Sequence, residues 1–357
     1  MTGSPDPLLV ALNGWYAGRA VGSGRYLDEL AGALEAQARP GDAFDLVRPS
    51  RSRSNAYKVL FEQVEFPWRA RSAHVAHVPY WAPPALPLTP SVVTIHDLIP
   101  LVLPEYRTGP QHRAYVRLVE RATDRAAAVI ADSEHTARDI RALLGVPDEI
   151  VHVVPLGVDP RFSPFPAANR LSLPERFGLY LGGFDRRKNL EVLLAAWRSV
   201  HEATGLPLAL AGAPPDAASS TKLHPTDIAS RVGLPPDALV LLGHVPTSDL
   251  PELYRRAAVF AYPSLYEGFG LPPLEAMACG TPTVVAAATS LPEVVGDAAA
   301  LVEPHDEVAW ADALRRIVED EARSAALSAA GLNRAKVFDW ARTAAMTRAV
   351  YESVRRN

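Results

Sequence analysis

The chain has 357 residues, of which 48% are hydrophobic, and its formal net charge is −4. This length and balance fit a globular protein with enough apolar surface for two domains. The slight acidic excess argues against nucleic acid as a partner, because nucleic-acid binders normally carry a basic excess. The one cysteine, Cys279, excludes an intramolecular disulfide and is expected to be a buried thiol. No signal peptide and no run of 18 apolar residues is visible, so we expect a cytoplasmic protein.

The first half of the chain alternates short apolar runs with helical patterns, which predicts a parallel sheet covered by helices. The expected helices span about 25–38, 111–126 and 134–144. The expected strands are 8–12, 75–78, 91–95, 128–131 and 151–154.

A stretch rich in proline and small residues, 157–175, is the expected linker. Alternation then restarts, with strands at 179–181, 208–211, 240–242, 257–261, 282–287 and 299–302, and helices between them. The sequence therefore predicts an α/β protein with two doubly wound, Rossmann-like domains. We place the first at 1–165 and the second at 166–339, with a helix at 340–357 packing back on the first. Ligands of such folds bind beyond the carboxyl ends of the strands, so a cleft between the halves is expected.

Two glycine-containing loops could approach a phosphate. Gly22 and Gly24 in "VGSGRY" lie before an expected helix, but the spacing is not a Rossmann fingerprint. In "LGGFDRRKNL" (181–190), Arg186, Arg187 and Lys188 follow a strand that ends in two glycines. This triplet is either an exposed basic turn or a cationic clamp for a diphosphate.

A third loop, "YEGFGLPPLEAMACGTP" (266–282), contains two glutamates, Glu267 and Glu275. Pro272 and Pro273 fit the first turn of a helix that Gly280 ends. A strand, a glycine loop and a helix N-terminus together favour an anion, with the donors supplied by the N–H groups of Gly268 to Leu271. The alternative is a glycine-rich turn with two solvated glutamates.

The segment "EGFGLPPLE" (267–275) resembles the E-x7-E signature of the retaining family-4 glycosyltransferases with the GT-B fold. Further pieces agree in order along most of the chain: "GSGRY" (22–26), "HDLIP" (96–100), "ADSEHTARDI" (131–140), "VPLGVD" (154–159), "RRKNL" (186–190), "LLGHVPTSDL" (241–250) and "ACGTPTVVA" (278–286). The pattern is most similar to the bacterial polysaccharide-assembly branch, which includes many mannosyltransferases.

The resemblance implies a nucleotide-diphosphate sugar in the cleft, with His96, Lys188 and Glu267 as catalytic residues. It assigns Lys188 to the diphosphate, Glu267 to the donor sugar and Glu275 to the ribose hydroxyls. His96 would lie near C6 of the sugar. The remaining donor-binding residues would be Gly22 and Gly24 at the leaving phosphate, His244 and Val245 at the base, and the N–H groups of Gly268, Phe269, Gly270 and Leu271.

One position departs from the family pattern. Many members have an arginine just after the first glycine of the second loop, whereas Gly183 and Phe184 follow Gly182 here. Arg186 or Arg187 is expected to supply that second positive charge, and Lys188 is the firmer assignment.

The resemblance implies a retaining transfer of a sugar, with mannose from GDP-mannose the first expectation, to a glycan or lipid-linked acceptor. The alternative is a nucleotide-sugar-binding or epimerase-like GT-B protein without transferase activity. We expect no cofactor and no metal, because the chain contains no Asp-x-Asp pair of the kind that commonly holds a cation beside a diphosphate.

The segment 48–72 combines basic and aromatic residues, and we predict that it contacts the acceptor or the anionic inner face of a membrane. A solvated loop and helix is the alternative. The residues that carry this prediction are Arg48, Arg51, Arg53, Lys58, Arg69 and Arg71 with Tyr57, Phe61, Phe66 and Trp68.

Overall fold

The computed structural model describes residues 6–19, 21–50, 54–106, 109–166, 173–215, 219 and 221–356. The chain divides into two compact units, an N-terminal unit of Met1–Gly157 with Asp339–Asn357 and a C-terminal unit of Val158–Phe338. The boundary predicted from the sequence, residue 165, differs from this division. Residues just after Gly157 pack within the C-terminal unit, where the N–H of Val158 donates to the carbonyl of Phe338 and the Phe162 ring lies edge-on to Tyr254.

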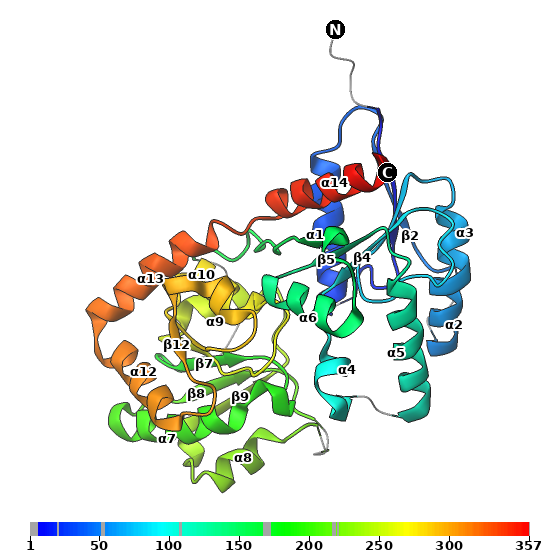
Figure 1. The fold of residues 1–357 in the computed structure, drawn as a ribbon. Helices are drawn as coiled ribbons and strands as arrows, with labels where there is room; N and C mark the ends of the chain where they lie inside the picture. The colour runs from blue at the N-terminus through cyan, green and yellow to red at the C-terminus, as the bar shows by residue number, and fades with distance from the viewer. Residues whose placement is uncertain are drawn as a thin grey trace. The chain divides into compact units, whose positions relative to one another are not determined.

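Each unit contains a six-stranded sheet in which all described pairs are parallel, which confirms the doubly wound α/β class (Figure 1). The first sheet has the order β2-β1-β3-β4-β5-β6 and the second β12-β11-β10-β7-β8-β9. The strands are β1 Leu9–Asn13, β2 Ala43–Val47, β3 Val75–Val78, β4 Ser91–Ile95, β5 Ala128–Ala131, β6 Val151–Val153, β7 Gly178–Leu181, β8 Leu208–Ala211, β9 Leu239–Gly243, β10 Val259–Tyr262, β11 Thr283–Ala286 and β12 Ala300–Val302.

The helices of the N-terminal unit include two that meet from opposite ends of the chain, α1 and α14, which lie side by side (Figure 1). A buried hydrogen bond of 2.6 Å joins the Tyr351 hydroxyl of α14 to Nδ1 of His77 on β3. The α-helices of this unit are α1 Gly22–Ala36, α2 Asn55–Leu60, α3 Phe66–Ala70, α4 Ile99–Val102, α5 Gly109–Thr123, α6 Glu134–Leu144 and α14 Trp340–Arg356.

The helices of the C-terminal unit are α7 Leu190–Thr204, α8 Pro225–Arg231, α9 Leu250–Arg256, α10 Leu271–Ala278, α11 Leu291–Val295, α12 Glu307–Glu319 and α13 Glu321–Ala335. Local sequence explains several of their ends. In the N-terminal unit α6 begins at a Ser133 cap that accepts from the N–H of Thr136, and it ends at Gly145 with φ +65°. Asn189 precedes α7 with φ +53°, a conformation that asparagine tolerates better than most residues.

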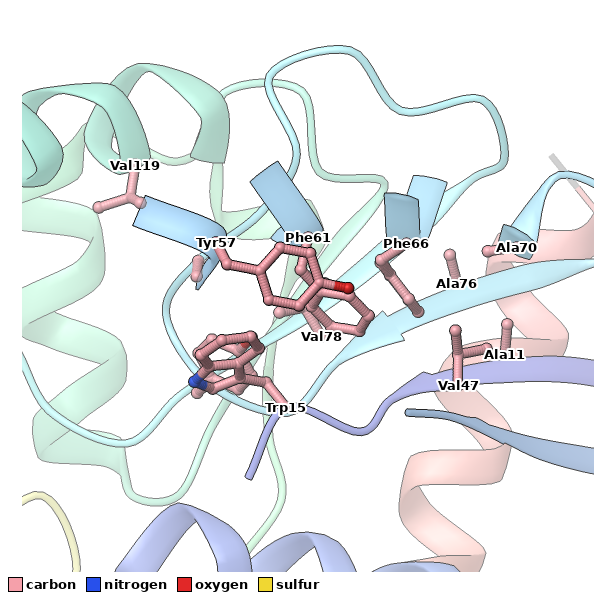
Figure 2. Close-up of a cluster of buried hydrophobic side chains, with 12 residues drawn as sticks. Ala11, Trp15, Val47, Tyr57, Phe61, Phe66, Ala70, Ala76, Val78 and Val119 are labelled. Atoms are coloured by element: carbon pink, nitrogen blue, oxygen red, sulfur yellow. The ribbon is translucent and has the colours of Figure 1, made fainter. Parts of the chain in front are cut away.

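The segment from 55 to 70 is a nearly continuous helix with a π-helical turn, Phe61–Glu65, between α2 and α3. Its inner face supplies Tyr57, Phe61 and Phe66 to a core cluster with Trp15 and Val78 (Figure 2). The expectation that Tyr57, Phe61 and Phe66 contact an acceptor or a membrane is therefore wrong, because all three are buried. Arg51 and Arg53 lie outside the described residues.

Candidate active site

In the second sheet β7 and β10 are paired neighbours, and the strand order reverses between them. Strands β8 and β9 follow on the far side of β7, and β11 and β12 follow on the far side of β10. Crevices at such switch points, beyond the carboxyl ends of the strands, are the usual ligand sites of doubly wound sheets. The loop after β7 contains Arg187 and Lys188, and the loop after β10 contains Ser264 and Glu267. The switch point therefore brings together two of the motifs that the sequence singled out.

Glu267 is the centre of this cluster. Its Oε1 atom accepts hydrogen bonds from Lys188 Nζ at 2.5 Å, Ser264 Oγ at 2.5 Å, Arg187 Nη1 at 3.0 Å and the Tyr262 hydroxyl at 3.0 Å. Lys188 Nζ also donates to the Tyr262 hydroxyl at 2.7 Å. Within the described part of the chain, Glu267 Oε2 and the third ammonium N–H of Lys188 have no partner, so each could serve a ligand.

Lys188 and Arg187 both bond the Glu267 carboxylate, and these contacts govern the protonation of Glu267 and Lys188. Burial alone would raise the pKa of Glu267, but Lys188 and Arg187 outweigh burial and lower that pKa to about 2. Burial lowers the pKa of Lys188, and Arg187 acts in the same direction while Glu267 opposes it. Asp185 lies 3.1 Å from Nε of Arg187 and balances its charge. The cluster thus holds an ionised Glu267 and, with Asp185 included, has no net charge, so it would bind an anion through directed N–H donors rather than through excess positive charge.

The loop from Glu267 to Leu271 is fixed by its own contacts. The Ser290 hydroxyl bonds the carbonyls of Glu267 at 2.9 Å and Phe269 at 2.7 Å. Gly270 has φ +118°, and a Cβ there would lie 2.8 Å from the Leu291 side chain, so only glycine fits. The N–H groups of Phe269, Gly270 and Leu271 donate to no acceptor among the described residues. They precede or open α10, as an anion-binding loop requires.

A cavity of about 160 Å³ lies at the carboxyl ends of β7, β8 and β9. His244 and Val245 both line it. The rest of its wall is apolar or glycine: Leu181, Gly182, Ala211, Gly212 and Leu250. The cavity and the Glu267 cluster share the loop that begins at Gly182.

Glu275 lies in the interior of α10 and is only 2% exposed. Its Oε2 atom accepts a hydrogen bond of 3.0 Å from the buried Tyr254 hydroxyl.

The thiol of Cys279 is buried near Glu275. Burial and the nearby Glu275 raise the pKa of this thiol to about 12, as expected for a structural cysteine rather than a nucleophile.

Of the two arginines in the β7 loop, Arg187 is the one that contacts Glu267. Its guanidinium bonds Glu267 and, at 2.9 Å, the carbonyl of Tyr266. Arg186 instead lines a separate, smaller cavity with Asp185 and Asn189.

His96 belongs to the N-terminal unit, where it follows β4. Its Nδ1 lies 2.7 Å from Asp132 Oδ2 and its Nε2 lies 3.2 Å from the carbonyl of Pro79. Both partners are acceptors, so both ring nitrogens satisfy them only when protonated. Burial alone would lower the pKa of His96, but Asp132 raises it above its ordinary value, in agreement with this geometry. Asp132, which the sequence analysis did not single out as a site residue, lies at the end of β5 in the "ADSEHT" motif.

The structure shows where the two glycines of the first loop lie and what surrounds them. Helix α1 begins at Gly22, so "GSG" forms its first turn rather than a preceding loop. A Cβ on Gly24 would lie 2.3 Å from the carbonyl oxygen of Arg19 and 2.7 Å from that of Tyr16, so Gly24 is needed for close packing of the chain on itself. Gly22 faces open space.

Neither a metal-binding group of side chains nor a membrane-spanning helix is present in the described ranges. No group of three histidine, cysteine, aspartate or glutamate side chains there could hold a metal ion. No helix in the same ranges is long and apolar enough to span a membrane.

Two family models match the chain. "Glycosyltransferase Family 4" covers residues 21–162, and "Glycosyl transferases group 1" covers residues 164–334.

Among curated proteins, an O-antigen chain mannosyltransferase B from Escherichia coli is 30% identical over 262 residues, 70% of this chain and 67% of that protein. A serotype-specific mannosyltransferase WbdA from Escherichia coli is 32% identical over 269 residues, 71% of this chain but only 32% of that longer protein.

Among solved structures, a sucrose-phosphate synthase from Thermosynechococcus elongatus superposes with a TM-score of 0.73 at 23% identity, covering 97% of this chain and 98% of that one. This likeness shows the fold. With two Rossmann-like sheets and both family models matched, the chain belongs to the family-4, group 1 glycosyltransferases of the GT-B fold.

Proposed function

We propose that the protein is a retaining hexosyltransferase that moves mannose from GDP-mannose to a hydroxyl of a glycan or a lipid-linked acceptor. The observation that carries the proposal is the Lys188–Glu267 cluster at the β7/β10 switch point, beside a cavity of a size suited to a base. The choice of mannose rests on the two mannosyltransferases to which the chain is similar.

In this proposal the base occupies the cavity lined by His244 and Val245, and Glu275 accepts from the ribose. The diphosphate lies against the loop N–H groups of 269–271 and the third N–H of Lys188. The unpartnered Oε2 of Glu267 accepts a hydroxyl of the donor sugar. The contacts proposed for the diphosphate and the sugar thus use the loop N–H groups, Lys188 and Glu267, which can each bond a ligand.

The transfer breaks the bond between C1 of the sugar and the diphosphate oxygen, while a bond forms between C1 and the acceptor oxygen. The acceptor proton passes to the departing diphosphate on the same face of the sugar. Lys188, Arg187 and the loop N–H groups stabilise the negative charge that grows on the diphosphate. Glu267 is a poor nucleophile, because four donors bind its Oε1 and its pKa is about 2. We therefore infer a front-face reaction rather than a covalent glycosyl–enzyme intermediate.

His96 contributes as a positioned cation in this proposal. Both of its ring nitrogens already donate, to Asp132 and to the carbonyl of Pro79, so it has no lone pair with which to act as a base.

The reaction as proposed needs no divalent cation, because Lys188, Arg187 and the loop N–H groups neutralise the diphosphate. Activity should survive excess EDTA. Loss of activity on chelation, restored by Mg²⁺ or Mn²⁺ at a defined stoichiometry, would contradict the phosphate-clamp account.

We further propose that the outer face of the 55–70 helix rests on an anionic bilayer. Leu60, Val64 and Trp68 recur every four residues on this face and are 47%, 58% and 59% exposed. The Arg71 guanidinium lies 4.0 Å from the centre of the Trp68 ring, and Arg69 is exposed beside it. An apolar row edged by arginines is the pattern of an interfacial helix.

The donor assignment is tested by titrating GDP, UDP, GDP-mannose and UDP-glucose against the protein and then following nucleotide release. The proposal expects GDP-mannose to bind best and GDP to be released only when an acceptor is added. Binding without release under any acceptor would favour a nucleotide-sugar-binding protein, and conversion of the sugar without an acceptor would favour an epimerase.

A further inference from the structure

The N-terminal sheet has a switch point of its own, between β1 and β3. Asn13 ends β1, Tyr80 follows β3, and the Tyr80 hydroxyl bonds Asn13 Oδ1 at 3.0 Å across this point. Crevices of this kind are where doubly wound sheets bind ligands. The donor-binding residues proposed above all belong to the C-terminal unit, whereas Asn13 and Tyr80 belong to the N-terminal unit.

A caged lysine lies beside Tyr80. Lys58 Nζ lies 4.9 Å from the centre of the Tyr115 ring and 5.6 Å from the centres of Tyr16 and Tyr80. It also lies 3.4 Å from Oε1 of Glu62, and the Tyr115 hydroxyl bonds Oε2 of Glu62 at 2.9 Å. The side chain of Lys58 is 21% exposed, whereas that of Glu62 is fully buried on the π-helical turn. Turns of this kind are often found at functional sites.

Two buried polar atoms next to this cage lack hydrogen-bond partners among the described residues. One is an acceptor, Glu62 Oε1, and the other is a donor, Asn13 Nδ2. Asn13 and Glu62, which carry these two atoms, each lie next to Tyr80. Buried polar atoms are normally paired, so an unpaired donor and an unpaired acceptor need an explanation. A hydroxyl group both donates and accepts, so a hydroxyl of a ligand or of water suits such atoms.

We propose that this cluster binds one pyranose ring of the acceptor, with the half-buried Tyr16 and Tyr115 rings against its C–H face and Lys58 bonded to its hydroxyls. Aromatic faces next to paired charges suit a sugar, which presents apolar C–H groups on its faces and hydroxyls at its edge. Glu62 acts as a positioning residue that holds Lys58 and Tyr115. The inference rests on the proposed function, because it assigns the ring to the acceptor.

The test measures sugar binding without turnover, so it is independent of whether transfer is observed. Saturation-transfer NMR on the full chain would use methyl α-D-mannopyranoside as the probe, with GDP present to fill the donor site. We expect a signal from the wild type and about a tenfold weaker affinity in Tyr16→Ala and in Lys58→Gln, which corresponds to the loss of one good contact. Lys336→Gln, at an exposed lysine in the C-terminal unit, is the matched control.

In the transfer assay the same variants should raise the acceptor KM and leave the GDP-mannose KM unchanged. Wild-type protein without a probe signal would mean that water alone serves the two atoms and would overturn the proposal. A mannoside signal that GDP displaces, or that both variants retain in full, would also overturn it. If Tyr16→Ala does not fold, the sugar affinity of Lys58→Gln alone tests the proposal.

Discussion

Lys188 Nζ lies 2.5 Å from Glu267 Oε1 although 79 positions separate the two residues in the chain. The contact exists because β7 and β10 are neighbours at the point where the strand order reverses, so the loops that follow them meet. The glutamate fixes the lysine, and the lysine keeps the glutamate ionised. The two residues are therefore expected to act as one unit within the proposed donor site.

Removal of the lysine should weaken both donor binding and turnover. Lys188→Ala deletes a charge-assisted contact, which costs about 1.5–3 kcal/mol, or about ten- to a hundredfold in affinity. Calorimetric titration with GDP and kcat/KM for GDP-mannose measure the two effects, with Lys336→Ala as the control. A kcat/KM close to that of wild type would remove Lys188 from the site.

Substitutions of Glu275 and Glu267 should affect GDP affinity and turnover differently. Glu275→Gln should weaken free GDP, because Glu275 is assigned to the ribose. Glu267→Gln should reduce kcat more than GDP affinity, because its free Oε2 is assigned to the sugar. Titration of GDP against both variants, together with turnover of GDP-mannose, checks this division. Equal losses of GDP affinity would show that the ribose and the sugar are wrongly assigned to Glu275 and Glu267.

The Glu267 ion pair should also stabilise the C-terminal unit in a pH-dependent way. The pKa of Glu267 falls from 4.5 to about 2 on folding, so its stabilisation is present above pH 4.5 and is lost as the pH falls toward 2. The shift corresponds to about 3 kcal/mol. Urea unfolding of wild type and Glu267→Gln from pH 7 to pH 3 should show the two curves converging in acid.

Glu303→Gln, at an exposed glutamate of the same unit, should run parallel to wild type over this range. A constant gap between wild type and Glu267→Gln at every pH would contradict the assigned pKa.

The outer face of the 55–70 helix should bind vesicles that contain phosphatidylglycerol. Burying one large apolar side chain contributes about 1.5–3 kcal/mol, so Trp68→Ser and Val64→Ser should each weaken vesicle binding by about tenfold or more. Co-sedimentation at low and high salt measures the binding, which salt should reduce through the arginines. Val308→Ser, at a valine that is 72% exposed on α12, is the control. Equal binding by all three variants would exclude this face.

Much of the architecture could be read from the apolar runs, because parallel strands are buried on both faces and carry continuous hydrophobic stretches. Strand β2 was missed because it lies at the edge of its sheet and includes an exposed Asp45, which breaks the apolar run. The chemistry-bearing loops after β7 and β10 were visible from their glycines and charges.

The partners of those loops were not visible in the sequence. Tyr262 reads as the last residue of a buried strand and Ser264 as a turn residue, and only the strand order brings their hydroxyls to Glu267. The same holds for Asp132 beside His96 and for the cage around Lys58, whose members come from distant segments. Gly24 shows the reverse case, in which a glycine that suggested a ligand is required by chain packing.

The most direct test of the central claim is the anomeric configuration of the product. The protein would be incubated with GDP-mannose and a mannoside acceptor, and the new linkage would be read from the one-bond C1–H1 coupling by NMR. The account predicts an α-linked mannosyl product formed in step with GDP release, and loss of both in Lys188→Ala. A β-linked product, or GDP release without a new glycosidic bond, would contradict it.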